Sequence, residues 1–107
     1  MEFSYGEGLF IEGEKKINGT IILSEHKLFL KGSEGDLTST YLPLEKIEKI
    51  KKIDRGIQVH VRPSLAYRYV AVIKGKNNNI SELINDIVKR RQLKKQFLRN
   101  EWKEQQN

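Results

Sequence analysis

The sequence contains no cysteine and only two histidines, His26 and His60. Without thiols the chain cannot form disulfide bonds or thiolate metal sites, and two imidazoles are too few for most structural zinc sites. No apolar run approaches the ~18 to 20 residues of a membrane-spanning helix, and the first residues lack the basic flank and apolar core of a signal peptide. We therefore expect a cytoplasmic protein with no metal or other cofactor, stabilised by packing alone.

The 107 residues include 20 lysines and arginines against 14 aspartates and glutamates, a formal net charge of +6. A chain of this length is expected to form one domain and to bury roughly 60 to 70% of the surface that its unfolded form exposes. The charge is compatible with anionic partners, but lysine and glutamate mixed along a sequence also favour a merely solubilising surface. We favour the solubilising interpretation for most of these charges.

Short apolar segments with a period of two indicate antiparallel strands over about residues 8–74. In the most regular of them, Ile57, Val59 and Val61 alternate with polar residues, which predicts one buried face. Residues 1–7 are expected to be a loosely held lead-in. The seven strands are expected near residues 9–11, 17–23, 27–31, 37–42, 44–53, 57–61 and 66–74.

The segment 44–53 has two interpretations. Leu44, Ile47, Ile50 and Ile53 recur at every third position, which suits a short helical turn. The flanking strands favour instead a bulged or partly coiled fifth strand. We favour the strand and leave the turn as the alternative.

From Asn79 the apolar period becomes that of a helix. Asn79 is a suitable N-cap, and Glu82 three residues later resembles a capping box. Burying each residue of the apolar stripe contributes ~1.5 to 3 kcal/mol, so the helix is expected to dock on the sheet. The stripe consists of Ile80, Leu83, Ile84, Ile87 and Val88.

Beyond Val88 the expected stripe positions become cationic, which predicts a helix to about residue 100 with a basic tail, residues 89–107, overhanging the core. Replacing Arg91 and Lys94 by alanine is then expected to leave the melting temperature nearly unchanged. We favour the interpretation that this basic tail is a solvated surface. The alternatives are that it binds a protein partner or a second copy of the chain, or that it binds an anionic membrane or nucleic acid. Candidate partner-binding residues are Arg91, Lys94, Lys95, Phe97, Leu98 and Trp102, and weaker anion-binding candidates are Lys15, Lys16, Lys89, Arg90 and Arg99.

Catalytic patterns are scarce. Ser24 and His26 lie two residues apart in a turn with no acidic residue placed to orient the histidine. The acidic residues are embedded among lysines, and no glycine-rich phosphate loop opens a helix. We expect no enzyme activity and assign no catalytic or metal-binding residue.

Seven strands followed by one amphipathic helix resemble the pleckstrin homology (PH) superfold, and within it the GRAM and bacterial PH families. The similarity covers about residues 8–90 and lies in Gly19-Thr20-Ile21-Ile22-Leu23-Ser24, Lys27-Leu28-Phe29-Leu30 and Leu42-Pro43-Leu44-Glu45-Lys46-Ile47. The resemblance implies a mainly β fold, in which a bent seven-stranded antiparallel sheet or barrel is capped by the helix over about 80–100. It implies a single PH-like domain over residues 1–107.

Such domains are docking platforms for lipid headgroups, peptides or proteins, so the resemblance implies a non-catalytic binding module. In phosphoinositide-binding members, a lysine ending the first strand and a basic pair along the second hold the phosphates; here Lys15 and Lys16 match the first part, and Ile17-Asn18-Gly19-Thr20 replaces the second. A similar early hairpin opens the archaeal chemotaxis adaptor proteins. The resemblance therefore favours a protein partner or a homo-oligomer. A basic adaptor for nucleic acid or an anionic membrane surface, peripherally attached, is the alternative, as is a chemotaxis-adaptor-like protein.

Overall fold

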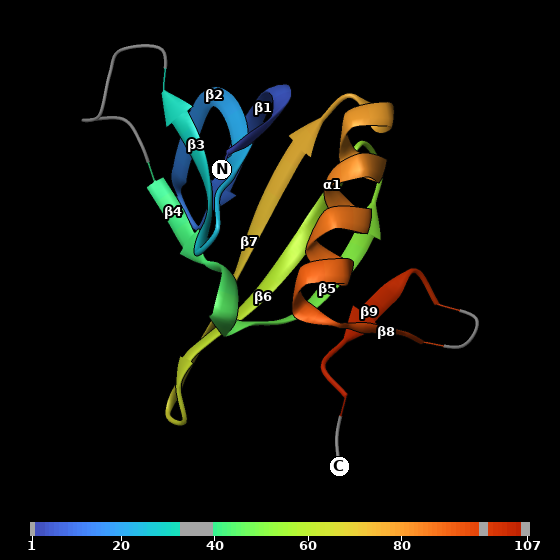
Figure 1. Ribbon diagram of the computed structural model, residues 1–107. Coiled ribbons are helices and arrows are strands. Elements are labelled where there is room, and N and C mark those ends of the chain that lie inside the picture. The colour runs from blue at the N-terminus through green and yellow to red at the C-terminus, as the bar shows by residue number, and fades with distance from the viewer. Residues whose placement is uncertain (1, 33–39, 97–98, 106–107) are drawn as a thin grey trace.

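The computed structural model describes residues 2–32, 40–96 and 99–105 and is shown in Figure 1. Within these ranges, nine strands form one antiparallel sheet in the order β4-β3-β2-β1-β7-β6-β5-β9-β8, in place of the seven predicted. The seven longer strands are β1 (Phe3–Glu12), β2 (Lys15–Leu23), β3 (Lys27–Gly32), β4 (Thr40–Pro43), β5 (Ile47–Ile53), β6 (Gly56–Ser64) and β7 (Tyr67–Gly75). They are followed by α1 (Asn77–Arg91), the one α-helix of the described residues, and then by the short strands β8 (Lys94–Lys95) and β9 (Glu101–Lys103).

The first residues do not form the loose lead-in that was predicted. β1 begins at Phe3, and Tyr5 is buried with its hydroxyl donating a hydrogen bond to the carboxylate of Asp86 on α1. Burial, this hydrogen bond and the charge of Asp86 together raise the pKa of Tyr5 well above its usual value. The strand is irregular between Ser4 and Glu7, where Gly6 has a φ of 79°. Pairing with β2 and this bond to the helix thus hold a segment in which only Phe3 and Tyr5 alternate with small residues.

The buried face predicted for residues 57–61 is confirmed, and aligned buried leucines also occur in β2, β3 and β4. Leu23, Leu28 and Leu42 lie opposite one another across β2, β3 and β4, and all three are buried. The inward face of β6 is buried as well: Ile57 lies opposite Ile73 of β7, Val59 opposite Ala71, and Val61 opposite Tyr69. The start of the predicted fourth strand, 37–39, lies outside the described residues.

Segment 44–53 combines the two interpretations of its sequence. Leu44–Lys46 is a 3-10 turn, η2, and β5 follows directly. A bulge between Ile47 and Lys49 inserts one residue into β5, so that Ile47 and Ile50, three positions apart, both face the core. The threefold spacing therefore arises from a turn followed by a bulged strand.

Helix α1 supplies the predicted cover. Ile80, Leu83, Ile84 and Ile87 are buried, and Val88 packs partly buried against the same core. The helix begins earlier than predicted, with Lys76 as N-cap and no side-chain capping bond, so Asn79 is not the cap. Figure 1 shows α1 lying over β6 and β7, with its first turn near the end of β7.

The helix does not continue to residue 100, and the described residues after Arg91 form no basic helical overhang. It ends at Arg91 because Gln92 adopts the left-handed conformation (φ 54°), and the Leu93 amide donates to the Val88 carbonyl over 3.0 Å. Leu93 is buried, which directs the chain back onto the sheet. We call the described residues after the helix, 92–96 and 99–105, the C-terminal arm.

Strand β9 of the C-terminal arm pairs with β5, placing Trp102 opposite Ile50. Two further backbone bonds extend this seam, from the Lys52 amide to the Asn100 carbonyl (2.7 Å) and from the Glu104 amide to the Glu48 carbonyl (3.0 Å). The arm is therefore an integral edge of the sheet, as Figure 1 shows at the red end of the chain. In the described part of the protein, no helix has the length and apolar character needed to cross a membrane.

Candidate anion-binding surface

Pairing of the C-terminal arm with β5 brings four basic side chains into one line across the sheet. Lys94 lies opposite Lys103, Lys103 opposite Lys49, and Lys49 opposite His60. Their chain neighbours Ile50 and Val59 are buried in the core, so the four side chains belong to the outer face. We call Lys94, Lys103, Lys49 and His60 the basic row.

A hollow of about 1040 Å³ lies along the basic row. We call it the basic hollow. Its lining carries five lysine and arginine side chains against two glutamates, an excess of three positive charges. The lining residues are Glu48, Lys49, His60, Arg68, Leu93, Lys94, Lys95, Gln96, Lys103, Glu104 and Gln105.

Both lining glutamates are already paired. The Glu48 carboxylate lies 3.4 Å from Arg68 Nε, and the Glu104 carboxylate accepts a hydrogen bond from Arg91 Nη2. Lys95 places its ammonium over the Trp102 ring at 5.9 Å from the centroid. The cations best placed to receive an external anion are therefore the exposed Lys94 and the half-buried Lys103.

Two buried polar atoms lie toward the inner end of the basic row. Glu101 is only 7% exposed; its Oε1 lies 3.9 Å from Lys49 Nζ, and its Oε2 has no hydrogen-bond partner among the described residues. His60 Nε2 is buried and likewise lacks a partner in the described part of the chain. Unsatisfied buried polar atoms are costly. Of these two residues only His60 lines the hollow, so the ring of His60 is the group for which a ligand could supply a missing bond.

The acid–base behaviour of His60 gives a test of this environment. Burial, followed by the charge of Lys49, lowers the pKa of His60 below its usual 6.5, while Glu48 and Glu101 oppose the shift. At pH values between the lowered pKa and 6.5, His60 binds a proton more readily in the unfolded chain than in the folded protein. The contribution of the neutral, buried His60 to the free energy of unfolding is therefore fully present above pH 6.5 and is lost as the pH falls through this range. We expect urea unfolding to show a lower free energy of unfolding at pH 5.5 than at pH 7.5.

His60→Gln should weaken this pH dependence, whereas His26→Gln, at a histidine whose side chain is 89% exposed, should leave it intact. If the free energy of unfolding depended equally on pH in the two variants, burial of the His60 imidazole would not be the cause of the pH dependence. Histidine NMR titration of the folded protein provides the direct measurement.

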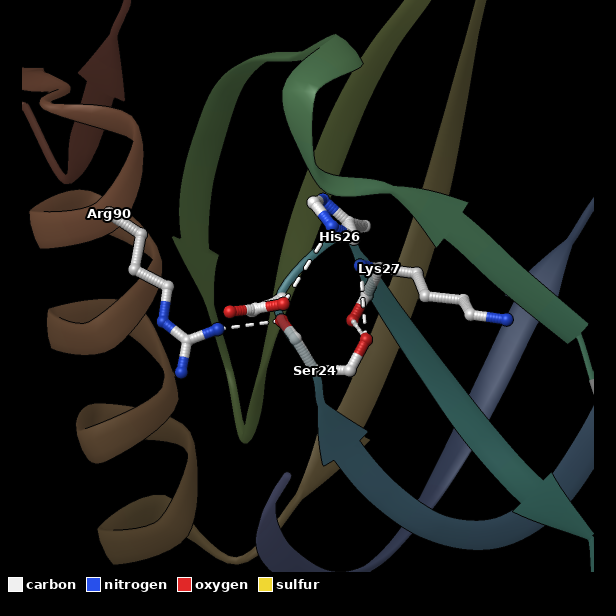
Figure 2. A network of polar contacts seen from close by, with 5 residues as sticks. Ser24, His26, Lys27 and Arg90 are labelled. Atoms are coloured by element: carbon white, nitrogen blue, oxygen red, sulfur yellow. Dashed lines mark hydrogen bonds and ion pairs between the residues drawn. The ribbon is translucent and has the colours of Figure 1, made fainter. Parts of the chain in front are cut away.

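The structure separates the other residues that the sequence singled out. Arg91 is structural, because its Nε and Nη2 donate to the Ile47 carbonyl over 3.2 and 2.9 Å. Arg90 donates from Nη1 to the Ser24 carbonyl over 2.6 Å and stacks 5.4 Å from the Phe3 ring centroid. Figure 2 shows the Arg90 side chain reaching from α1 to the β2–β3 turn. Neither arginine lies on a helical overhang.

Lys94, Lys95 and Trp102 are brought together, but on strands of the C-terminal arm. Trp102 is half-buried against the core on strand β9 and is not presented on a helix. Lys15 and Lys16 lie at the start of β2, which is separated from β6 and the basic row by β1 and β7. Lys89 and Arg99 are exposed and are not members of the basic row. Phe97 and Leu98 lie outside the described residues.

Sequence reasoning missed Lys49, His60, Arg68 and Lys103. The alternation of residues 57–61 did place His60 on the outer face of β6, away from the buried Val59, and this was the available sequence signal for His60. The register of Lys49 and Lys103 depends on the β5 bulge and on β9, neither of which the sequence pattern defines. Arg68 lies on β7 and pairs with Glu48 of β5.

Ser24 and His26 do not interact with each other in the β2–β3 turn. The Ser24 hydroxyl bonds with the backbone of Lys27 at 3.2 Å, and His26 Nε2 lies 3.8 Å from Glu25 Oε2, as Figure 2 shows. Among the described residues, no cluster of three or more potential metal ligands occurs. A scan against models of protein families and searches of curated proteins and of solved structures found no match for this chain.

Proposed function

We propose that this protein is a non-catalytic, PH-like interaction module that binds an acidic segment of a protein partner in the basic hollow. The PH-like part of the proposal is supported by seven antiparallel strands, β1–β7, followed directly by an apolar-faced helix. The β8–β9 pair is an addition to that plan. It is this addition that contributes Lys94 and Lys103 to the hollow.

The basic row is the observation that carries the proposal. Four basic residues on four adjacent strands share one line and one face, beside a hollow whose lining has an excess of three positive charges. Complementary charge of this kind mainly determines which partners are selected and how fast they associate. Binding should therefore weaken with added salt, because the outer cations are solvent-accessible.

A protein partner is favoured over nucleic acid by the composition of the lining. Proteins that bind single strands combine cationic grooves with aromatic side chains on which bases stack. Among the described residues that line the hollow there is no phenylalanine, tyrosine or tryptophan on which bases could stack. A net positive lining without such aromatic side chains instead suits an acidic peptide.

The test measures binding of an octaglutamate peptide to the full chain, by calorimetry and by fluorescence of the sole tryptophan, Trp102. Reversing charge in Lys94→Glu with Lys103→Glu should weaken binding at least about tenfold, since each lost ion pair is worth up to ~1 kcal/mol. The matched control, Lys16→Glu with Lys31→Glu, makes the same change in net charge at exposed positions of β2 and β3 and should change the affinity less than about twofold. Equal loss in both variants would reduce the effect to net charge and overturn the proposal.

The net charge of +6 favours one rival, a basic protein that binds nucleic acid or an anionic membrane surface. Titrations with duplex DNA and with vesicles containing phosphatidylserine, at about 0.15 M salt, distinguish the two. We expect neither to bind under these conditions. Binding of DNA or vesicles that is tighter than that of octaglutamate, and is abolished by the Lys94 and Lys103 reversals, would assign the hollow to the rival.

A further inference from the structure

We infer that the acidic segment bound in the basic hollow is an α-helix, lying across β8, β9, β5 and β6 with one face of carboxylates on the basic row. The inference rests on the proposed function and specifies the conformation of the partner. It follows from the spacing of the row, from the size of the hollow and from the unpartnered imidazole nitrogen at the row's inner end.

The spacing of the basic row matches a helix better than an extended peptide. Neighbouring strands lie about 4.8 Å apart, so the three steps from Lys94 to His60 cover about 14 Å. On a helix, same-face residues three or four apart are separated by about 4.5 to 6 Å along the axis, and three such steps cover about 14 to 18 Å. In an extended strand, same-face residues are about 6.7 Å apart and three steps cover about 20 Å, which overshoots the row by more than one strand.

The hollow also has the dimensions of a short helical segment. An α-helix with its side chains is about 10 to 12 Å in diameter and rises about 5.4 Å per turn, so two turns occupy roughly 850 to 1200 Å³. The basic hollow has a volume of about 1040 Å³. Two turns of helix lying in it would be held along one side by the row and bordered by Leu93 and Gln96 of the C-terminal arm.

The inner end of the row supplies an independent reason for a carboxylate there. His60 Nε2 is buried without a hydrogen-bond partner among the described residues, while Lys49 beside it already lies near Glu101. A glutamate of the helix directed toward His60 would provide the missing partner. The exposed Lys94 at the outer end, about 14 Å from His60, would receive a second glutamate between two and three turns away along the same face.

The experiment compares three acetylated and amidated 20-residue alanine-based peptides of equal charge, each with four glutamates. In the first, the glutamates occupy one helical face at four-residue intervals. In the second they are distributed around the helix, and in the third the striped order is kept but two central alanines are replaced by proline, which prevents the helix. Circular dichroism confirms the helicity of each peptide, and calorimetry with the full chain gives the affinities.

The striped helical peptide is expected to bind about tenfold more tightly than either of the others, because only its glutamates meet the row together. Its binding should be lost in the Lys94→Glu with Lys103→Glu variant, and should shift the NMR resonance of the His60 ring. Equal affinities for all three peptides would overturn the helical inference while leaving anion binding in place. No binding by any peptide, together with none by octaglutamate, would overturn the proposed function itself.

Discussion

Replacing Ile87 with aspartate is expected to leave the protein unfolded at 25 °C. Ile87 has 0% exposure and lies in the core beneath α1. Truncating a buried isoleucine costs about 2 to 5 kcal/mol, and burying an unpaired carboxylate adds several more. The sum equals or exceeds the net stability of about 5 to 15 kcal/mol that is typical of small domains. Circular dichroism should show no cooperative thermal transition.

Two further variants separate burial from charge. Ile87→Val keeps the site apolar and should cost only about 1 kcal/mol, with the cooperative transition preserved. Lys89→Asp introduces the same carboxylate two residues away at an exposed position of α1, and should melt close to the parent protein. A cooperative melt of Ile87→Asp within a few degrees of Lys89→Asp would contradict the docking of α1 on the sheet.

Replacing Arg91 with alanine is expected to lower the free energy of unfolding by about 2 kcal/mol. The Arg91 guanidinium joins three elements, because Arg91 is the last residue of α1, donates to the Ile47 carbonyl at the start of β5, and pairs with Glu104 of the C-terminal arm. Hydrogen bonds from a charged donor are worth about 1.5 to 3 kcal/mol, and the 22% exposure of the Arg91 side chain reduces this only in part. The melting temperature should fall by roughly 5 to 10 °C.

The matched control is Lys94→Ala, three residues further along, at an exposed position of β8. Its melting temperature should remain that of the parent protein, although octaglutamate should bind less tightly. This division reverses the expectation from the sequence, in which Arg91 and Lys94 belonged to one solvated overhang and neither affected stability. Equal melting temperatures for Arg91→Ala and Lys94→Ala would mean that the arm is not anchored through Arg91.

Apolar periodicity predicted the parts of the fold whose burial is local. The period of two in Ile57, Val59 and Val61 and the stripe from Ile80 to Ile87 both identify the buried side chains, because each pattern needs only one element and one core. The 44–53 segment was ambiguous for a physical reason: a 3-10 turn and a bulged strand place apolar residues at the same threefold spacing.

The end of the helix could not be predicted in this way. The chain reverses at Gln92, which has a positive φ without being glycine or asparagine, the residues that usually mark such a stop. Strand β9 is only three residues long and its apolar member, Trp102, is equally compatible with a helical face. The basic row depends on both features, since its members are widely separated in sequence and a one-residue slip of β9 would turn Lys103 to the other face.

The closed seam between β5 and the C-terminal arm has a consequence for how two molecules can meet. The backbone groups of β5 from Glu48 to Lys52 are paired with residues 100–104 of the same chain. The terminus of a neighbouring copy could make the same bonds, so the fold contains a direct route to reciprocal strand exchange at high concentration. Removing the terminus would instead leave β5 as an open template, and the sheet would then recruit other chains edge to edge in the manner of a growing fibril.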